Sequence, residues 1–225
     1  MKQLVLLSFL VFSLSITTNA SAKSTLRQID FTTNELKNIG GHYSTIYGYI
    51  YIQVNGKRVS TNVDGKTIQL IKKSDGRFYP RYKLLNLFPI NLGDLSFSLM
   101  LNENKQQIRM YKKNNKNKKL TARIVAQKFE PKVVPPLWKS RLGKYKATLV
   151  KGKSKIKDIR LAIKRGVLVA FINKLKNPYP LLALSSSKLF SPSAGHNKER
   201  KINIGTKNKL LTLSYGTNNL LLTKL

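Results

Sequence analysis

The chain contains no cysteine, and this absence removes several classes of site. Without thiols there is no disulfide, no zinc–thiolate centre, no cysteine nucleophile and no lipid attached to an N-terminal cysteine. Imidazoles are also scarce, because His42 and His196 are the two histidines. Neither the His-x-x-x-His nor the Glu-x-x-His spacing of common metal sites occurs. We therefore expect no metal and no cofactor, and a fold held together by its apolar core.

Acidic residues are the second shortage. Nine Asp and Glu stand against 42 Lys and Arg, which gives a formal net charge of +33. Asp64 and Asp75 precede glycine in turn-like sequences and Glu35 fits a helix cap, so no pair of carboxylates stands out as a glycosidase site. A chain this basic attracts polyanions at low salt. Two explanations stay open: a solvated basic surface in a Lys/Asn-rich chain, or a selected anionic partner.

Long hydrophobic runs are missing after the amino terminus. No later segment approaches the roughly 20 apolar residues that a transmembrane helix needs. At the amino terminus, Lys2 precedes a short apolar run over residues 4–16, and Ala20-Ser21-Ala22 has the A-x-A form of a cleavage site. We predict a signal peptide over residues 1–22, cleaved after Ala22. The mature chain is then exported, to the periplasm or out of the cell, with no transmembrane segment.

The remaining chain has the periodicity of antiparallel strands. Apolar residues alternate along residues 47–54, and the turn-forming pairs Asn55-Gly56 and Asp64-Gly65 follow at hairpin spacing. A Pro-rich linker over residues 131–136 separates a first module, residues 23–130, from a second, residues 137–225. We predict an all-β fold of two consecutive antiparallel β-meander or barrel-like (lipocalin-like) modules, each entered through a short helix.

An internal repeat supports this division. ELKNIGGHY at residues 35–43 and LWKSRLGKY at residues 137–145 both read as a helical turn, then Gly, then Tyr, at a spacing of 102 residues. Its structural signature is Gly41, Tyr43, Trp138, Gly143 and Tyr145. We expect the helical turn to cover one end of each sheet, and the Tyr ring to pack inside with its hydroxyl hydrogen-bonded. His42 occupies the place of Lys144 in the repeat, which favours a surface position.

Candidate catalytic serines are few. There is no Gly-x-Ser-x-Gly, and Ser-x-x-Lys occurs at Ser154 and Ser185, where neither serine opens a predicted helix. We therefore predict no catalytic residue, although a hydrolase site assembled in space from distant residues stays an alternative.

A basic loop tip is the strongest local charge cluster. Possible polyanion contacts are Lys112, Lys113, Lys116, Lys118 and Lys119. The competing explanation is a solvated loop rich in turn-forming Asn. Export makes nucleic acid the less favoured polyanion.

Several short motifs carry a resemblance to a known family. They are LWKSRLGKY, Pro178-Tyr179-Pro180-Leu181 with Leu184, Leu189-Phe190, and Leu211 with Tyr215-Gly216. In this order they resemble the C-terminal, lipocalin-like accessory region of beta-lactamase-related serine hydrolases. The first half is similar to the segment before it, through Gly41-His42-Tyr43, Asp75-Gly76-Arg77-Phe78 and Phe88-Pro89.

The resemblance implies a β-barrel module that elsewhere covers or shapes an active site. In that family the catalytic Ser-x-x-Lys lies in a large preceding domain, whereas here the predicted signal peptide leads straight into the accessory-like region. We therefore expect an exported, non-catalytic binding or accessory protein, whose partner is an anionic envelope component or a separately encoded hydrolase. The alternatives are a secreted polyanion-binding protein and a stand-alone serine hydrolase.

Overall fold

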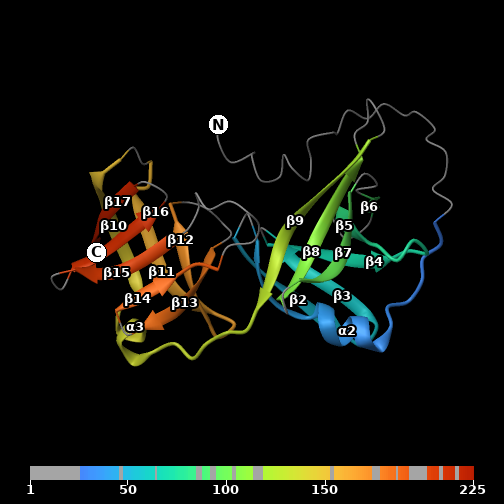
Figure 1. Ribbon diagram of the computed structural model, residues 1–225, viewed down its shortest axis with the longest axis horizontal. Helices are drawn as coiled ribbons and strands as arrows, with labels where there is room; N and C mark the ends of the chain where they lie inside the picture. Colours follow the sequence, from blue (N-terminus) through green and yellow to red (C-terminus); the bar gives the residue numbers. More distant parts are fainter. Residues whose placement is uncertain are drawn as a thin grey trace.

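The protein consists of two closed antiparallel β-barrels that lie side by side (Figure 1). The computed structural model describes residues 26–45, 48–63, 65–84, 88–91, 95–102, 105–113, 119–152, 155–173, 178–185, 187–192, 202–207, 210–215 and 218–225. The predicted signal peptide lies outside these residues. The predicted fold class, two consecutive all-β modules, is confirmed.

The first barrel is entered through helix α2 (Thr33–Ile39). Its strands are β1 (Gly41–Thr45), β2 (Gly48–Asn55), β3 (Arg58–Val63), β4 (Lys66–Lys72), β5 (Phe78–Leu84), β6 (Phe88–Asn91), β7 (Leu95–Asn102), β8 (Lys105–Lys113) and β9 (Leu120–Phe129). They are ordered β4-β3-β2-β1-β9-β8-β7-β5-β6, and a β4–β5 pairing closes the ring, with β6 attached to β5. Closure leaves these strands without the long open edges of a flat sheet.

The second barrel is entered through helix α3 (Pro136–Ser140). Its strands are β10 (Gly143–Lys151), β11 (Asp158–Lys164), β12 (Val167–Ile172), β13 (Tyr179–Ser185), β14 (Lys188–Phe190), β15 (Ile202–Lys207), β16 (Leu210–Tyr215) and β17 (Asn218–Lys224). They pair in chain order and β17 returns to β10. Leu189, Ile204 and Leu213 are fully buried inside.

The strand predicted along residues 47–54 corresponds to β2, but the turn after it differs from expectation. Asn55 pairs with Arg58, so the β2–β3 turn is centred on Gly56-Lys57 rather than on Asn55-Gly56. The β11–β12 turn has two central residues, because Lys164 pairs with Val167. Arg165 (φ 51°) and Gly166 (φ 77°) both adopt positive φ, as a tight hairpin turn requires.

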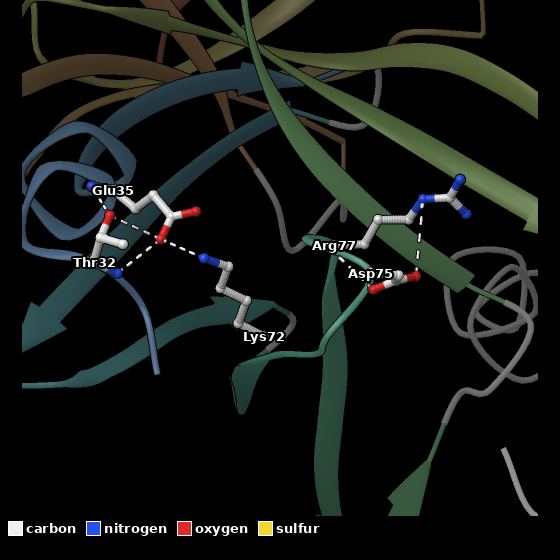
Figure 2. Close-up of polar contacts among 5 residues, drawn as sticks. All are labelled: Thr32, Glu35, Lys72, Asp75 and Arg77. Carbon is white, nitrogen blue, oxygen red and sulfur yellow. Dashed lines mark hydrogen bonds and ion pairs between the residues drawn. The ribbon is translucent and has the colours of Figure 1, made fainter. Parts of the chain in front are cut away.

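Helix α2 begins at a capping box that also ties it to the sheet (Figure 2). The Thr32 backbone N–H donates to Glu35 Oε2 over 2.7 Å, and Lys72 Nζ donates to the same oxygen over 2.7 Å. Burial raises the pKa of Glu35, but the hydrogen bonds from Lys72 and Thr32 outweigh it, and the net pKa is lowered. Figure 2 also shows Asp75, which accepts from the Arg77 backbone N–H in the β4–β5 turn.

The internal repeat corresponds to the same hydrogen bond in both barrels. Tyr43 Oη donates to the Ile39 carbonyl over 2.9 Å, and Tyr145 Oη donates to the Arg141 carbonyl over 2.5 Å. Both tyrosine rings are buried, with exposed fractions of 0% and 2%. Each hydroxyl is hydrogen-bonded, as predicted, and the bond that it donates satisfies a carbonyl at the end of the covering helix.

A glycine and a lysine complete this repeated arrangement. Gly41 has φ 124° and Gly143 has φ 136°, values that side-chain-bearing residues rarely adopt. The last strand of each barrel carries a lysine whose side chain lies close to this glycine, Lys128 beside Gly41 and Lys224 beside Gly143. Each lysine also reaches the covering helix. Lys128 Nζ donates to the Asn38 carbonyl over 2.8 Å, and Lys224 Nζ to the Ser140 carbonyl over 3.4 Å. The repeat is thus a way of fastening a helix over one end of a barrel.

The Pro-rich linker is only partly a spacer. Val134 is buried in the core of the second barrel, and Pro136 is the first residue of α3. The segment 131–136 therefore contributes to the second barrel as well as joining it to the first.

The barrels touch through outward-facing side chains. Tyr49 and Phe129 of the first barrel pack with Val167, Val169 and Leu182 of the second. The Tyr49 backbone N–H donates to the Pro178 carbonyl over 2.6 Å, and Ser44 Oγ donates to the Pro192 carbonyl. We call these eight residues the inter-barrel contact. On strand β2, Tyr49 and Tyr51 face the second barrel, while Ile50 and Ile52 face the interior of the first.

Candidate functional site

The first barrel encloses a cavity of about 190 Å³. All eight strands of the closed ring contribute to its wall. The apolar lining residues are Ile50, Ile52, Val63, Ile68, Leu70, Phe78, Pro80, Leu95, Phe97, Ile108, Met110, Val125 and Ala126. Thr45 and Thr61 supply the two hydroxyl groups. An apolar cavity of this kind is a site for an apolar ligand or for the apolar part of one.

The cavity occupies the half of the barrel that lies away from helix α2. Gly40, at the end of the helix, lies against Val54, whereas the cavity is lined by Ile50 and Ile52 farther along the same strand. Helix α2 therefore covers one end of the barrel, and the cavity lies toward the end that is farther from this helix. We call the end farther from α2 the mouth. The lining residues nearest to it are Thr45, Val63, Leu95 and Lys112.

The strand register explains how basic residues reach an apolar cavity. Ile108, Met110 and Lys112 share the inward face of β8 because side chains alternate along a strand. Met110 pairs with Arg123 of β9, which places Arg123 on the same face. Lys112 and Arg123 are exposed although they line the cavity, so their side chains extend from its wall to solvent. Of the lining residues that the structure describes, these two carry charge, and both are positive.

The barrel wall beside the cavity has a weakly paired seam. A single residue pair, Phe78 with Phe97, joins β5 to β7. Their rings stack at 5.8 Å with an interplanar angle of 16°. Pro80 follows two residues later and has no backbone N–H to continue the ladder toward β7. Side-chain packing therefore replaces backbone hydrogen bonds along this part of the wall.

The structure describes three of the five lysines predicted to contact a polyanion. Lys112, Lys113 and Lys119 are exposed, while Lys116 and Lys118 lie outside the described residues. Lys112 and Arg123 both line the cavity, and neither position was expected from the sequence. The alternation Ile108, Met110, Lys112 was a usable signal for Lys112. Nothing local in the sequence shows that Arg123 lies opposite Met110, because that depends on the β8–β9 register.

The two Ser-x-x-Lys serines have different outcomes. Ser154 lies outside the described residues. Ser185 is exposed at the β13–β14 turn, where it pairs with Lys188 and its Oγ accepts from the Ser187 backbone N–H over 3.2 Å. Its carbonyl accepts from Trp138 Nε1 over 3.3 Å. Ser185 therefore stabilises the turn through its hydroxyl and holds the Trp138 ring through its carbonyl.

His42 is the one histidine among the described residues; it lies on the outward face of β1, as a surface position requires, but it is only partly exposed. It is half-buried beside the inter-barrel contact, and its Nδ1 lies 2.9 Å from Tyr49 Oη. Its ring also meets that of Tyr51 edge-on at 4.9 Å. Burial lowers the pKa of His42, and nearby Arg165 and Lys128 lower it further against the opposite effect of Glu130. The outward side of β1 is covered by the second barrel, which the repeat with Lys144 did not reveal.

Comparison with protein-family models, curated proteins and solved structures found no match for this chain. The resemblance to the accessory region of beta-lactamase-related hydrolases therefore stays a prediction from its motifs. Across the described part of the chain, no helix is long and apolar enough to cross a membrane. The same residues hold no group of three or more His, Asp or Glu placed to bind a metal ion.

Proposed function

We propose that the protein is a non-catalytic binding protein, and that its first barrel holds a small apolar molecule or the apolar part of a larger one. The cavity carries this proposal. Its volume of about 190 Å³ exceeds the ~150 Å³ of apolar cavities that stay dry and bind benzene. The second barrel, whose described residues form a cluster of buried apolar side chains, serves as the scaffold against which the first one packs.

The size of the cavity limits what it binds. It is smaller than the roughly 300–1,000 Å³ of pockets that take drug-sized ligands. A single ring or one short alkyl chain fits, whereas a two-chain lipid does not. Each methylene that moves from water into the cavity contributes about 0.8 kcal/mol, which is about a fourfold change in Kd.

A series of straight-chain alcohols from butanol to decanol tests the proposal by calorimetric titration of the purified protein. We expect the affinity to rise about fourfold per methylene and then to level off when the chain outgrows the cavity. The plateau separates a bounded cavity from adsorption to the surface. Absence of binding by every alcohol in the series would refute the proposed function.

Two substitutions and one matched control locate the site. Ala126→Leu fills the cavity from its wall, because Ala126 lines it and is 2% exposed. Val63→Phe fills it from the mouth, where Val63 is only half-buried and a larger ring is easier to accommodate. Both variants should lose alcohol binding. Ala122→Leu makes the same change as the first on the exposed outer face of β9 and should bind as the wild type does.

Binding of a polyanion is the second candidate function. It rests on the exposed Lys112, Lys113 and Lys119 and on the net charge of +33. Affinity for heparin or for a teichoic-acid-like polymer should fall steeply with salt, and replacing these lysines with Gln should reduce the slope. We also propose that the chain is exported and that it acts beside a separately encoded hydrolase, as the sequence motifs imply.

A further inference from the structure

We infer that the ligand of the first barrel carries a single aromatic ring, which lies against Phe78, Phe97 and Met110. We call these three residues the Phe–Met row. The inference rests on the proposed function, because it concerns the same cavity. It goes further by selecting one class among the small apolar molecules that the volume admits.

The first argument is the position of the Phe–Met row in the wall. Phe78 of β5 pairs with Phe97 of β7, and Phe97 pairs in turn with Met110 of β8. Directly opposite residues share one face of a sheet, and all three residues line the cavity. The described lining residues of the other strands are aliphatic or polar. The aromatic rings and the sulfur are therefore gathered on one side of the cavity.

The second argument is the geometry of the two rings. Phe78 and Phe97 stack nearly parallel, with centroids 5.8 Å apart and an interplanar angle of 16°. Phe78 is 4% exposed and also packs against Phe31, whose ring is 6.4 Å away, so its position is fixed before any ligand arrives. A third ring can meet such a pair edge to face or in an offset stack, and either arrangement contributes beyond the buried area. A saturated ring or an alkyl chain gains the area contribution alone.

The third argument is the thioether of Met110. A methionine sulfur interacts favourably with an aromatic ring at about 5 Å, often at the ring edge. Met110 is half-buried beside Phe97, and its unbranched side chain can adjust to the outline of a ring. The end of the row thus adds a second preference for an aromatic ligand.

The fourth argument is the breadth of the cavity. All eight strands of the closed ring contribute to its wall, so the cavity extends across the barrel. An alkyl chain has to fold up to fill such a space, and it loses rotational freedom at each bond that is immobilised. A ring is rigid before it binds and avoids this cost.

The test compares benzyl alcohol, cyclohexylmethanol and heptanol, which have the same number of carbon atoms and the same hydroxyl group. Calorimetric titration gives each affinity, and dividing it by the water-to-octane partition coefficient of the probe removes differences in hydrophobicity. On this corrected scale we expect benzyl alcohol to bind about two- to tenfold more tightly than cyclohexylmethanol, the range for one aromatic pair. Heptanol should bind least.

Three variants assign this aromatic preference to the Phe–Met row. Phe97→Leu removes a half-buried lining ring and should lose most of the preference, and Met110→Leu, which conserves volume, should lower it. Phe31→Leu is the matched control, because it removes a ring that packs on Phe78 but is not among the lining residues, and it should keep the preference. Cyclohexylmethanol should bind each variant within about threefold of the wild type, since the aliphatic wall is intact.

The outcomes separate the two proposals. Equal corrected affinities of benzyl alcohol and cyclohexylmethanol in the wild type overturn this inference and leave an apolar binding protein. An undiminished preference in Phe97→Leu overturns it as well, and so does loss of the preference in Phe31→Leu while cyclohexylmethanol still binds. If circular dichroism shows that Phe97→Leu does not fold, Met110→Leu decides in its place by the same criterion. Failure of all three probes to bind the wild type overturns the proposed function too.

Discussion

Replacing Trp138 with Ala should strongly destabilise the second barrel. The indole is fully buried, so its removal costs the transfer free energy of the lost atoms and leaves a void, together about 3–5 kcal/mol. Two further contacts disappear with it. Nε1 donates to the Ser185 carbonyl over 3.3 Å, and the Arg141 guanidinium lies 4.8 Å from the ring centroid. We expect a loss near the upper end of this range, because the freed carbonyl is left beside the void.

The loss is large compared with the stability of an ordinary domain, which is about 5–15 kcal/mol. Urea unfolding followed by far-UV circular dichroism measures it in Trp138→Ala and in Leu137→Ala. Leu137 is the neighbouring helix residue, 44% exposed, and its substitution should change the unfolding free energy by no more than about 0.5 kcal/mol. A loss below about 1 kcal/mol in Trp138→Ala would show that the residue does not anchor α3 in the core.

Two further predictions concern the inter-barrel contact. Because Trp138 is the single tryptophan, its fluorescence follows the unfolding of the second barrel, whereas circular dichroism follows both barrels. The urea midpoints from the two signals should coincide in the wild type. Tyr49→Ala should separate them, since Tyr49 is buried in that contact, with 3% of it exposed. Unchanged coincidence in the variant would mean that Tyr49 does not couple the barrels. Burial lowers the pKa of His42 below its ordinary 6.5, so the unfolded chain takes up the proton first, and stability should fall as the pH drops below about 6.5. His42→Gln should flatten this dependence in urea titrations, and an equal slope in both proteins would contradict the assignment.

The alternation of apolar residues was sufficient to predict strands, and the Pro-rich linker and the internal repeat were sufficient to predict two modules. Ile50 and Ile52 lie on the interior face as the periodicity required, and Gly41 and Gly143 stand where the chain turns from helix to strand. Such features depend on local geometry: side chains alternate along any strand, and a positive φ favours glycine. Local geometry is also why the repeat of Tyr43 and Tyr145 could be recognised from spacing alone.

The candidate site could be predicted only in part from the sequence. Lys112 was singled out as part of a basic loop tip, but its inward orientation follows from its register with Leu95 and Thr121. Arg123 drew no attention, since it is one cation among 42 Lys and Arg. His42 was placed on the surface because it matches Lys144 in the repeat, and no local pattern shows that a second barrel covers the outer face of β1.

The sequence by itself therefore determined the class of fold, the two covering helices and the Gly and Tyr residues that fasten them, because these follow from interactions between residues close in the chain. The tertiary structure alone decided that the first barrel keeps a cavity, that Lys112 and Arg123 line its wall, and that Tyr49 and His42 lie beside the other barrel. Those features arise from how far-apart strands pair and how completely their side chains fill the space between them. Neither property is set by the residues next to one another along the chain.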